Sequence, residues 1–167
     1  ILVDGDFEGD NVAEQGCQYI LIAHNDLHDY GTEAVNDFEA IRFGFSGMQE
    51  TNSRSAIIRN VLTNIATEPE WISVKMEEVD VWGNTARGCI GSLSSRHGAQ
   101  NRFSHNYVFG PATGSAGTKA GGQRLYDDDI WVTDNYYEGL NGDGFQATIC
   151  IDGGDTTASN TGHKQVK

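Results

Sequence analysis

The stretch ILIAHNDL, residues 20–27, decides the fold of this chain because a short pattern within it returns four more times. Each copy has an asparagine, with a β-forming residue three positions before it and a second residue of the same phase two positions after it. Successive asparagines are 35, 24, 22 and 29 residues apart. The other copies are AIIRNVL (56–62), VDVWGNTA (79–86), RFSHNYV (102–108) and IWVTDNYY (130–137). Short strands that recur at such intervals, with polar turns between them, indicate a solenoid.

A second set of short β-patterned stretches lies between these copies, and neither set shows the 3.6-residue period of a helix. Its members are EAIRFG (39–44), EWISVK (70–75), GSLSSRHG (91–98), GQRLYD (122–127) and FQATICI (145–151). The two sets together predict an all-β, right-handed parallel β-helix of about five coils, with two or three strands in each coil. Because neither end of the chain resembles a cap, we expect residues 1–167 to be a single β-helix domain, incomplete at both ends, from a longer β-helix.

Equivalent residues of successive coils should stack about 4.8 Å apart, which is the spacing of neighbouring strands. The asparagines should form one column at a turn, because stacked amides can hydrogen-bond along the axis and asparagine tolerates left-handed turns. They are Asn25, Asn60, Asn84, Asn106 and Asn135. The residues three positions earlier should stack inside the coil. They are Ile22, Ile57, Val81, Phe103 and Val132.

The charge of the chain limits its partners. Lys and Arg number 11 against 24 Asp and Glu, so the formal net charge is −13, which argues against general nucleic-acid binding. Residues 42–124 differ from the rest because they hold nine basic and six acidic side chains, so this part can attract an anionic ligand locally. No apolar run is long enough to span a membrane. Cys17, Cys89 and Cys150 lie far apart, which favours buried thiols over a disulfide framework or a zinc site.

Charged and polar residues recur on successive stretches of the second set. Glu68 and Glu70 are two positions apart and project to one side of an extended chain, and Asn36 lies in the coil before them. Their oxygens suit Ca²⁺, although a solvated acidic turn has the same pattern. Lys75 and Arg96 are 21 residues apart, close to the repeat length, and should stack on neighbouring coils. Adjacent cations favour loss of the lysine proton and hence a base, although two ordinary surface cations would have the same spacing.

One geometric requirement follows from this spacing. Lys75 comes five positions after Glu70, so strict alternation would send the two side chains to opposite faces of a strand. A bend between them is therefore needed if both residues serve one site.

The stretch EPEWISVK…NTARGCIGSLSSRHG (68–98) is similar to the signature of polysaccharide lyase family six, the alginate lyases and chondroitinase B. The shared pattern is Glu-x-Glu, a Lys five residues later, an Asn-Thr, and then Arg-His-Gly. NDFEAIRFG (36–44) resembles the family's asparagine-containing segment before an Ile-Arg-hydrophobic-Gly strand. GGQRLY (121–126) and DNYYEGL (134–140) resemble its next coil, so the resemblance covers about residues 20–150.

The resemblance implies a role for each matching residue. It makes Asn36, Glu68 and Glu70 the ligands of a Ca²⁺ ion. Lys75 becomes the base, and Arg96 becomes the acid or the group that stabilises charge. The residues implied to contact the substrate are His97, Arg42, Arg124 and Tyr126.

Three residues depart from the family pattern: Pro69 between the glutamates, Met76 where a small polar residue is usual, and Glu39 where chondroitinase B has a glycine. Pro69 fixes its own φ but leaves both glutamates able to point together. Glu39 could add an oxygen ligand to the metal site, or it could pair with Arg42. None of the three departures removes a residue type that the chemistry needs.

The function implied is a Ca²⁺-assisted β-eliminating lyase of uronate-containing polymers, with alginate first and dermatan or chondroitin sulfate second. The metal would neutralise the uronate carboxylate, which makes the C5 proton easier to remove. The alternatives are a non-catalytic glycan-binding or structural β-helix, and a C5-epimerase on a similar fold. The expected partner is an anionic polysaccharide, with no nucleic acid and no membrane, and a secreted or periplasmic location follows from where such polymers are met.

Overall fold

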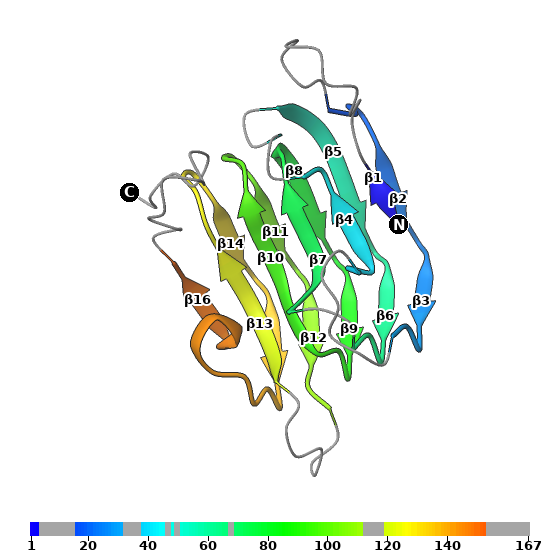
Figure 1. The fold of residues 1–167 in the computed structure, drawn as a ribbon. Helices are drawn as coiled ribbons and strands as arrows, with labels where there is room; N and C mark the ends of the chain where they lie inside the picture. The colour runs from blue at the N-terminus through cyan, green and yellow to red at the C-terminus, as the bar shows by residue number, and fades with distance from the viewer. Residues whose placement is uncertain are drawn as a thin grey trace.

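The computed structural model describes residues 1–3, 16–31, 38–45, 48, 51–66, 69–111 and 119–152. Within these residues the strands form three parallel sheets, and the chain visits the sheets in turn before it climbs to the next coil (Figure 1). The predicted parallel β-helix is confirmed. It has five coils in which one strand of each sheet follows another, beginning with β2, β3 and β4.

The three sheets are named A, B and C here, and their strands are given in spatial order. Sheet A contains β1 (Leu2–Val3), β4 (Ile41–Phe43), β7 (Glu70–Lys75), β10 (Gly91–His97), β13 (Ala120–Leu125) and β16 (Ile149–Ile151). Sheet B contains β14 (Trp131–Thr133), β11 (Arg102–Ser104), β8 (Glu77–Trp82), β5 (Asn52–Ile58) and β2 (Leu21–Ala23). Sheet C contains β15 (Tyr136–Glu138), β12 (Tyr107–Phe109), β9 (Thr85–Arg87), β6 (Val61–Thr63) and β3 (Asp26–His28).

The predicted asparagine column lies at the turn between sheets B and C. Each amide nitrogen from Asn25 to Asn106 donates to the side-chain oxygen of the asparagine one coil further on, at 2.9–3.1 Å. The same oxygen accepts a hydrogen bond from the backbone N–H of the preceding asparagine, as Asn84 Oδ1 does from Asn60 at 2.9 Å. The ladder therefore satisfies backbone groups as well as its own amides, which explains why asparagine recurs there.

The predicted inner column is also present, because the register pairs its five residues in sequence order. Four of them are buried, and Val132, on the last coil, is partly buried against the same core. Ile72 and Leu93, paired in register on sheet A, join this cluster from the other side. The core therefore runs along the inside of the coils, between the sheets.

Two details differ from the prediction. Each asparagine-bearing segment contains two strands, one in sheet B and one in sheet C, because the residue before the asparagine turns the chain. That residue has positive φ at His24 (58°), Arg59 (52°) and Gly83 (66°), so the left-handed position precedes the asparagine. FQATICI (145–151) is not one strand, since Gly144–Gln146 forms a 3₁₀ helix (η1) and β16 begins only at Ile149.

The cysteines form no disulfide; Cys89 is buried, whereas Cys17 and Cys150 are half-buried. Burial raises the pKa of the Cys89 thiol to about 11, so it stays protonated at neutral pH. In the described part of the chain, no helix is long and apolar enough to cross a membrane.

Candidate active site

Of the residues singled out from the sequence, those that the structure describes lie on the strands of sheet A or directly after them. Arg42, Ser73, Ser94 and Arg124 are register neighbours on β4, β7, β10 and β13. Side chains alternate along a strand, so this row faces away from the core that Ile72 and Leu93 enter. The outer face of sheet A therefore holds the candidate site.

Two bulges adjust which side chains reach this outer face. Ser92 of β10 pairs with Glu70 and the next residue, Leu93, pairs with Ile72, so Trp71 is an extra residue in β7. The extra residue reverses the alternation, and Glu70 therefore comes to the same face as Ser73 and Lys75. This is the bend that the spacing of Glu70 and Lys75 requires.

The second bulge lies at the other end of the same strand pair. Ser95 pairs with Val74 while His97 pairs with Lys75, which makes Arg96 an extra residue in β10. Lys75 and Arg96 thus lie on neighbouring strands, as their spacing predicts. His97 is buried beside Lys75 in register, and the bulge re-aims Arg96 across the sheet.

Glu70 forms the centre of a buried charge cluster. Its Oε1 accepts a hydrogen bond from Arg124 at 3.0 Å and lies 3.3 Å from Nε of Arg96. Its Oε2 accepts a bond from the Ser73 hydroxyl at 2.6 Å. Only 6% of the Glu70 side chain is exposed, so two arginines and one carboxylate share a site with little water. Such a cluster is sensitive to loss of any member, because a buried charge would lose its partner.

Tyr126 closes the side of this cluster. The guanidinium groups of Arg96 and Arg124 lie 4.8 and 4.6 Å from the centre of its ring, and Arg124 also donates to its hydroxyl. The hydroxyl donates in turn to Asp152 at 3.0 Å. Burial raises the pKa of Tyr126, against the opposing effect of Arg124, and the bond to Asp152 adds to the rise. Tyr126 therefore remains a neutral phenol at physiological pH.

Lys75 is held separately, by Glu39. Its Nζ donates to Glu39 Oε1 at 3.2 Å, and the exposed fractions of the two side chains are 12% and 3%. Sequence reasoning offered Glu39 as a metal ligand or as a partner of Arg42, and did not foresee the pair with Lys75. Glu39 lies two residues before the start of β4, and no feature of the sequence signals that contact.

The fit of the site to a calcium ion is tested by the acidic residues that the structure describes. Asn36 and Glu68 lie outside the described residues, and no three His, Cys, Asp or Glu side chains cluster as a metal site within them. Glu39 Oε2 is buried with no hydrogen-bond partner among the described residues. A buried carboxylate oxygen without a partner is the type of donor that calcium takes, so the donor chemistry fits.

Comparisons with known proteins identify the family and the fold. The chain matches the family Chondroitinase B over residues 6–167. It is similar to the solved structure of the PL6 family alginate lyase AlyGC, with 28% identity and a TM-score of 0.76 over 86% of this chain and 19% of that chain. A mannuronic acid specific polysaccharide family 6 lyase from human gut microbiota is 26% identical, with a TM-score of 0.73 over 86% of this chain and 30% of that one.

Alginate lyase AlyF-OU02, solved in complex with G6, is 18% identical with a TM-score of 0.65, over 96% of this chain and 46% of that chain, and supports the fold alone. No curated protein matches the chain. The chain spans about a fifth to a third of the length of the two more similar lyases. The family match covers nearly all of the sequence, and the chain therefore belongs to the Chondroitinase B family, polysaccharide lyase family 6.

Proposed function

We propose that this chain carries the catalytic face of a β-eliminating lyase that cleaves uronate-containing polysaccharides, with alginate as the first substrate. The observation that carries the proposal is the placing of Lys75 and Arg96 on neighbouring strands, each held against a buried carboxylate. The similarity to an alginate lyase and to a mannuronic acid specific lyase supports the choice of alginate.

In the proposed reaction the Lys75 ammonium, which pairs with Glu39 in this structure, first loses a proton to water. The neutral amine then accepts the proton from C5 of the uronate, while the C4–O bond breaks and a C4–C5 double bond forms. The electron pair of the C4–O bond leaves with the departing sugar oxygen. A guanidinium does not give up its proton in proteins, so Arg96 stabilises the charge on that oxygen through its N–H donors. The oxygen then takes its proton from water or from the protonated Lys75.

The other cations of the outer face would hold the polymer. Arg42 and Arg124 lie in one register row on either side of β7 and β10, so they can bind carboxylates of different sugars along the polymer. His97, beside Lys75, would orient the sugar that loses its proton.

Calcium would be held by Asn36, Glu68 and Glu70, and when bound it neutralises the uronate carboxylate and so acidifies the C5 proton. Glu70 is engaged by Arg96 and Arg124, so these arginines would exchange a protein carboxylate for substrate when the site is loaded. A secreted or periplasmic location completes the proposal, because such polymers are met outside the cytoplasm.

The test is incubation of the protein with alginate, mannuronate-rich and guluronate-rich fractions, and dermatan and chondroitin sulfate, while the absorbance of the new double bond is followed. We expect a rise with alginate that a calcium chelator abolishes and added calcium restores. Activity on dermatan sulfate is the second candidate, since the matching family is Chondroitinase B. Shorter chains without new absorbance, or no change with any polymer, would refute the lyase assignment.

A further inference from the structure

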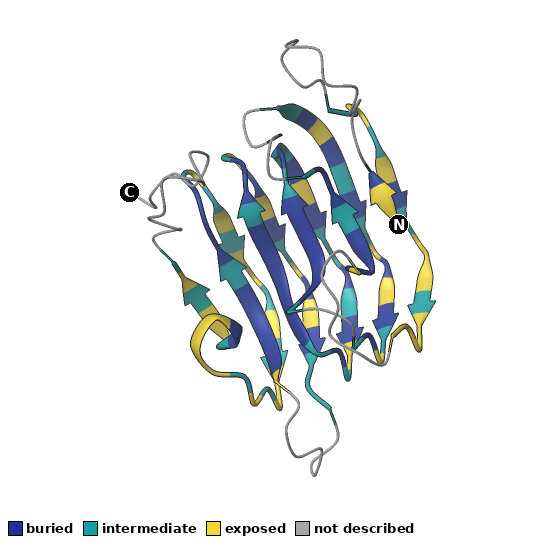
Figure 2. Ribbon diagram, in the orientation of Figure 1, coloured by how far each residue is buried: buried dark blue, intermediate teal, exposed yellow. Residues whose placement is uncertain are grey.

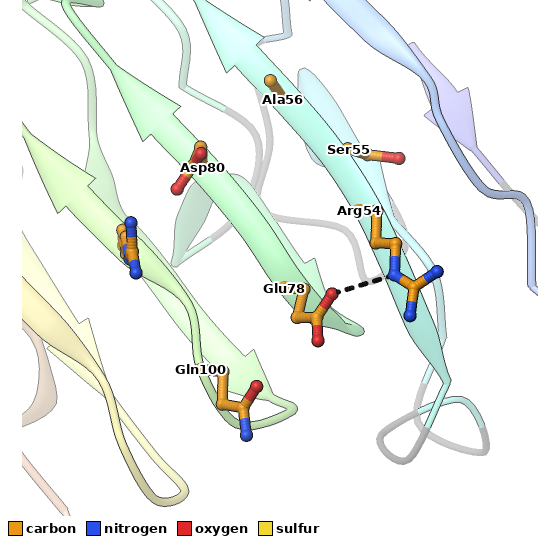
Figure 3. Close-up of a pocket in the computed structure, with 7 residues that line it drawn as sticks. Arg54, Ser55, Ala56, Glu78, Asp80 and Gln100 are labelled. Atoms are coloured by element: carbon orange, nitrogen blue, oxygen red, sulfur yellow. Dashed lines mark hydrogen bonds and ion pairs between the residues drawn. The ribbon is translucent and has the colours of Figure 1, made fainter.

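A hollow of about 450 Å³ lies on the outer face of sheet B, whose strands are separate from those of the candidate active site. Ser55 and Ala56 of β5 line it, and the small side chain of Ala56 leaves the outer face open there. Figure 3 shows the walls: Arg54 on β5, Glu78 and Asp80 on β8, and Gln100 just before β11. Arg102, the first residue of β11, also lines it.

Asp80 and Arg102 are register neighbours, yet they form no ion pair or hydrogen bond with each other or with another described residue. Both are exposed, and so is Gln100. The hollow thus offers acceptors from Asp80, donors from Arg102, and both from Gln100, and within the described part of the chain a ligand would break no ion pair of Asp80 or Arg102. A ligand with carboxylate and hydroxyl groups could use all of them.

The opposite wall is already ordered. Arg54 Nε lies 3.2 Å from Glu78 Oε2, and Arg54 Nη1 donates to the Tyr19 hydroxyl at 3.0 Å. Asn52 donates to the other oxygen of Glu78 at 2.8 Å. The register between β5 and β8 shifts between Asn52 and Ser55, so this wall, like the outer face of sheet A, is built on a bulge.

An exposed aromatic surface continues the row beyond Arg102. Trp131 of β14 is the register partner of Arg102, and its ring centre lies 5.4 Å from the guanidinium. Trp131 is 60% exposed, so its outer ring face is open to a ligand. Flat aromatic surfaces bind the apolar faces of sugar rings, while neighbouring polar groups take the hydroxyls.

We propose that this face is a second, non-catalytic binding site for a uronate-containing oligosaccharide, with Arg102 on a carboxylate, Asp80 and Gln100 on hydroxyls, and Trp131 under a sugar ring. The choice of a uronate rests on the proposed function. Two arginines balanced by two carboxylates disfavour a phosphate polymer, which needs a net positive surface. A sugar with one carboxylate and several hydroxyls requires such a mixture. The site would hold the polymer while another part of it occupies sheet A.

Isothermal titration calorimetry with an alginate hexasaccharide tests the site, in a Lys75→Ala background so that cleavage during the titration is strongly slowed. Arg102→Ala and Asp80→Asn are introduced separately. Arg59→Ala is the matched control, because it removes another exposed arginine, in the turn directly after β5, that stacks on Trp82 and does not line the hollow. A neutral glucan hexasaccharide tests the need for the carboxylate. Circular dichroism verifies folding of each variant.

We expect two binding sites, of which one loses about tenfold in affinity with Arg102→Ala and is unchanged with Arg59→Ala. A single site or none, equal binding of the neutral glucan, or identical titrations for Arg102→Ala and Arg59→Ala would overturn the proposal. Binding is measured without turnover, so a failure of the lyase activity is seen separately. Activity with only one binding site would overturn this proposal and leave the proposed function standing.

Discussion

Sheets A and B belong to the same coils but differ in how they treat their outer faces. In sheet B, β8 buries Val79 and Val81 and leaves Asp80 exposed, so its inner and outer sides are distinct. In sheet A, the first five residues of β7 and of β10 are all buried (Figure 2). Sheet B is an ordinary one-sided sheet, whereas the outer face of sheet A is occupied by its own network of polar and charged side chains.

This difference shows which sheet holds its charged side chains in fixed positions. On sheet B, Asp80 and Arg102 are exposed register neighbours, and within the described residues their side chains form no ion pair. On sheet A, Glu70 is fixed by three partners and Lys75 by one. Chemistry needs fixed groups in a dry site, while reversible binding of a polymer can use solvated ones.

The largest expected effect on stability comes from matched removal of one carboxylate on each sheet. Glu70→Ala should lower the free energy of unfolding by about 3–5 kcal/mol, because Arg96 and Arg124, both partly buried, lose their shared partner. Asp80→Ala should change it by no more than about 0.5 kcal/mol, since the side chain is exposed. Urea unfolding of both variants gives the comparison, and losses of equal size would remove the distinction between the sheets.

The asparagine ladder sharpens the comparison, because it is a buried polar network in the regular part of the coil. Asn84→Ala should lower the free energy of unfolding by about 2–4 kcal/mol. The Asn84 Nδ2 donates to Ile57 O and Asn106 Oδ1, and its Oδ1 accepts a hydrogen bond from Asn60. Asn25→Ala, at the end of the ladder, should cost about 1 kcal/mol. Thermal or urea unfolding measures both, and a larger cost at Asn25 would contradict the ladder account.

The smallest effect concerns Tyr137, whose hydroxyl is buried with no hydrogen-bond partner among the described residues. Tyr137→Phe should raise the free energy of unfolding at neutral pH by about 1 kcal/mol. Burial raises the pKa of Tyr137 to about 12, so above the ordinary value near 10 the unfolded chain ionises first and stability falls. Urea unfolding between pH 7 and 11 should show that the free energy of unfolding falls less at alkaline pH in Tyr137→Phe than in the parent. Equal losses in the two proteins would contradict the burial of the Tyr137 hydroxyl.

The fold was predictable because the sequence repeats where the structure does. The asparagine and the apolar residue three positions before it recur in every coil, and both columns are present. The division of each copy into two strands was not predictable from alternation, since the left-handed turn falls on residues as different as His24, Arg59 and Gly83. Pairing with the neighbouring coils fixes this turn, so the turn does not require one particular residue type.

The candidate site was predictable as a set of residues but not as a set of contacts. The motif spacing brings Lys75 and Arg96 to neighbouring strands. The sequence showed that a bend between Glu70 and Lys75 was needed. It could not place the bulge at Trp71, because no residue type marks a bulge. The pair of Glu39 with Lys75 depends on the three-dimensional course of β4 and β7. Asn36 and Glu68 lie outside the described residues, so their proposed role as ligands stays a prediction.

The most direct test of the account is the rate of double-bond formation from alginate as a function of calcium concentration in Lys75→Ala, Glu70→Gln and the control Arg59→Ala. We expect Lys75→Ala to be slower by about 10²–10⁴-fold at every calcium concentration, because no metal replaces a missing base. Glu70→Gln should regain part of its activity at high calcium, and Arg59→Ala should match the parent. Rescue of Lys75→Ala by calcium, or a Lys75→Ala rate equal to that of the control, would contradict the assignment of sheet A as the catalytic face.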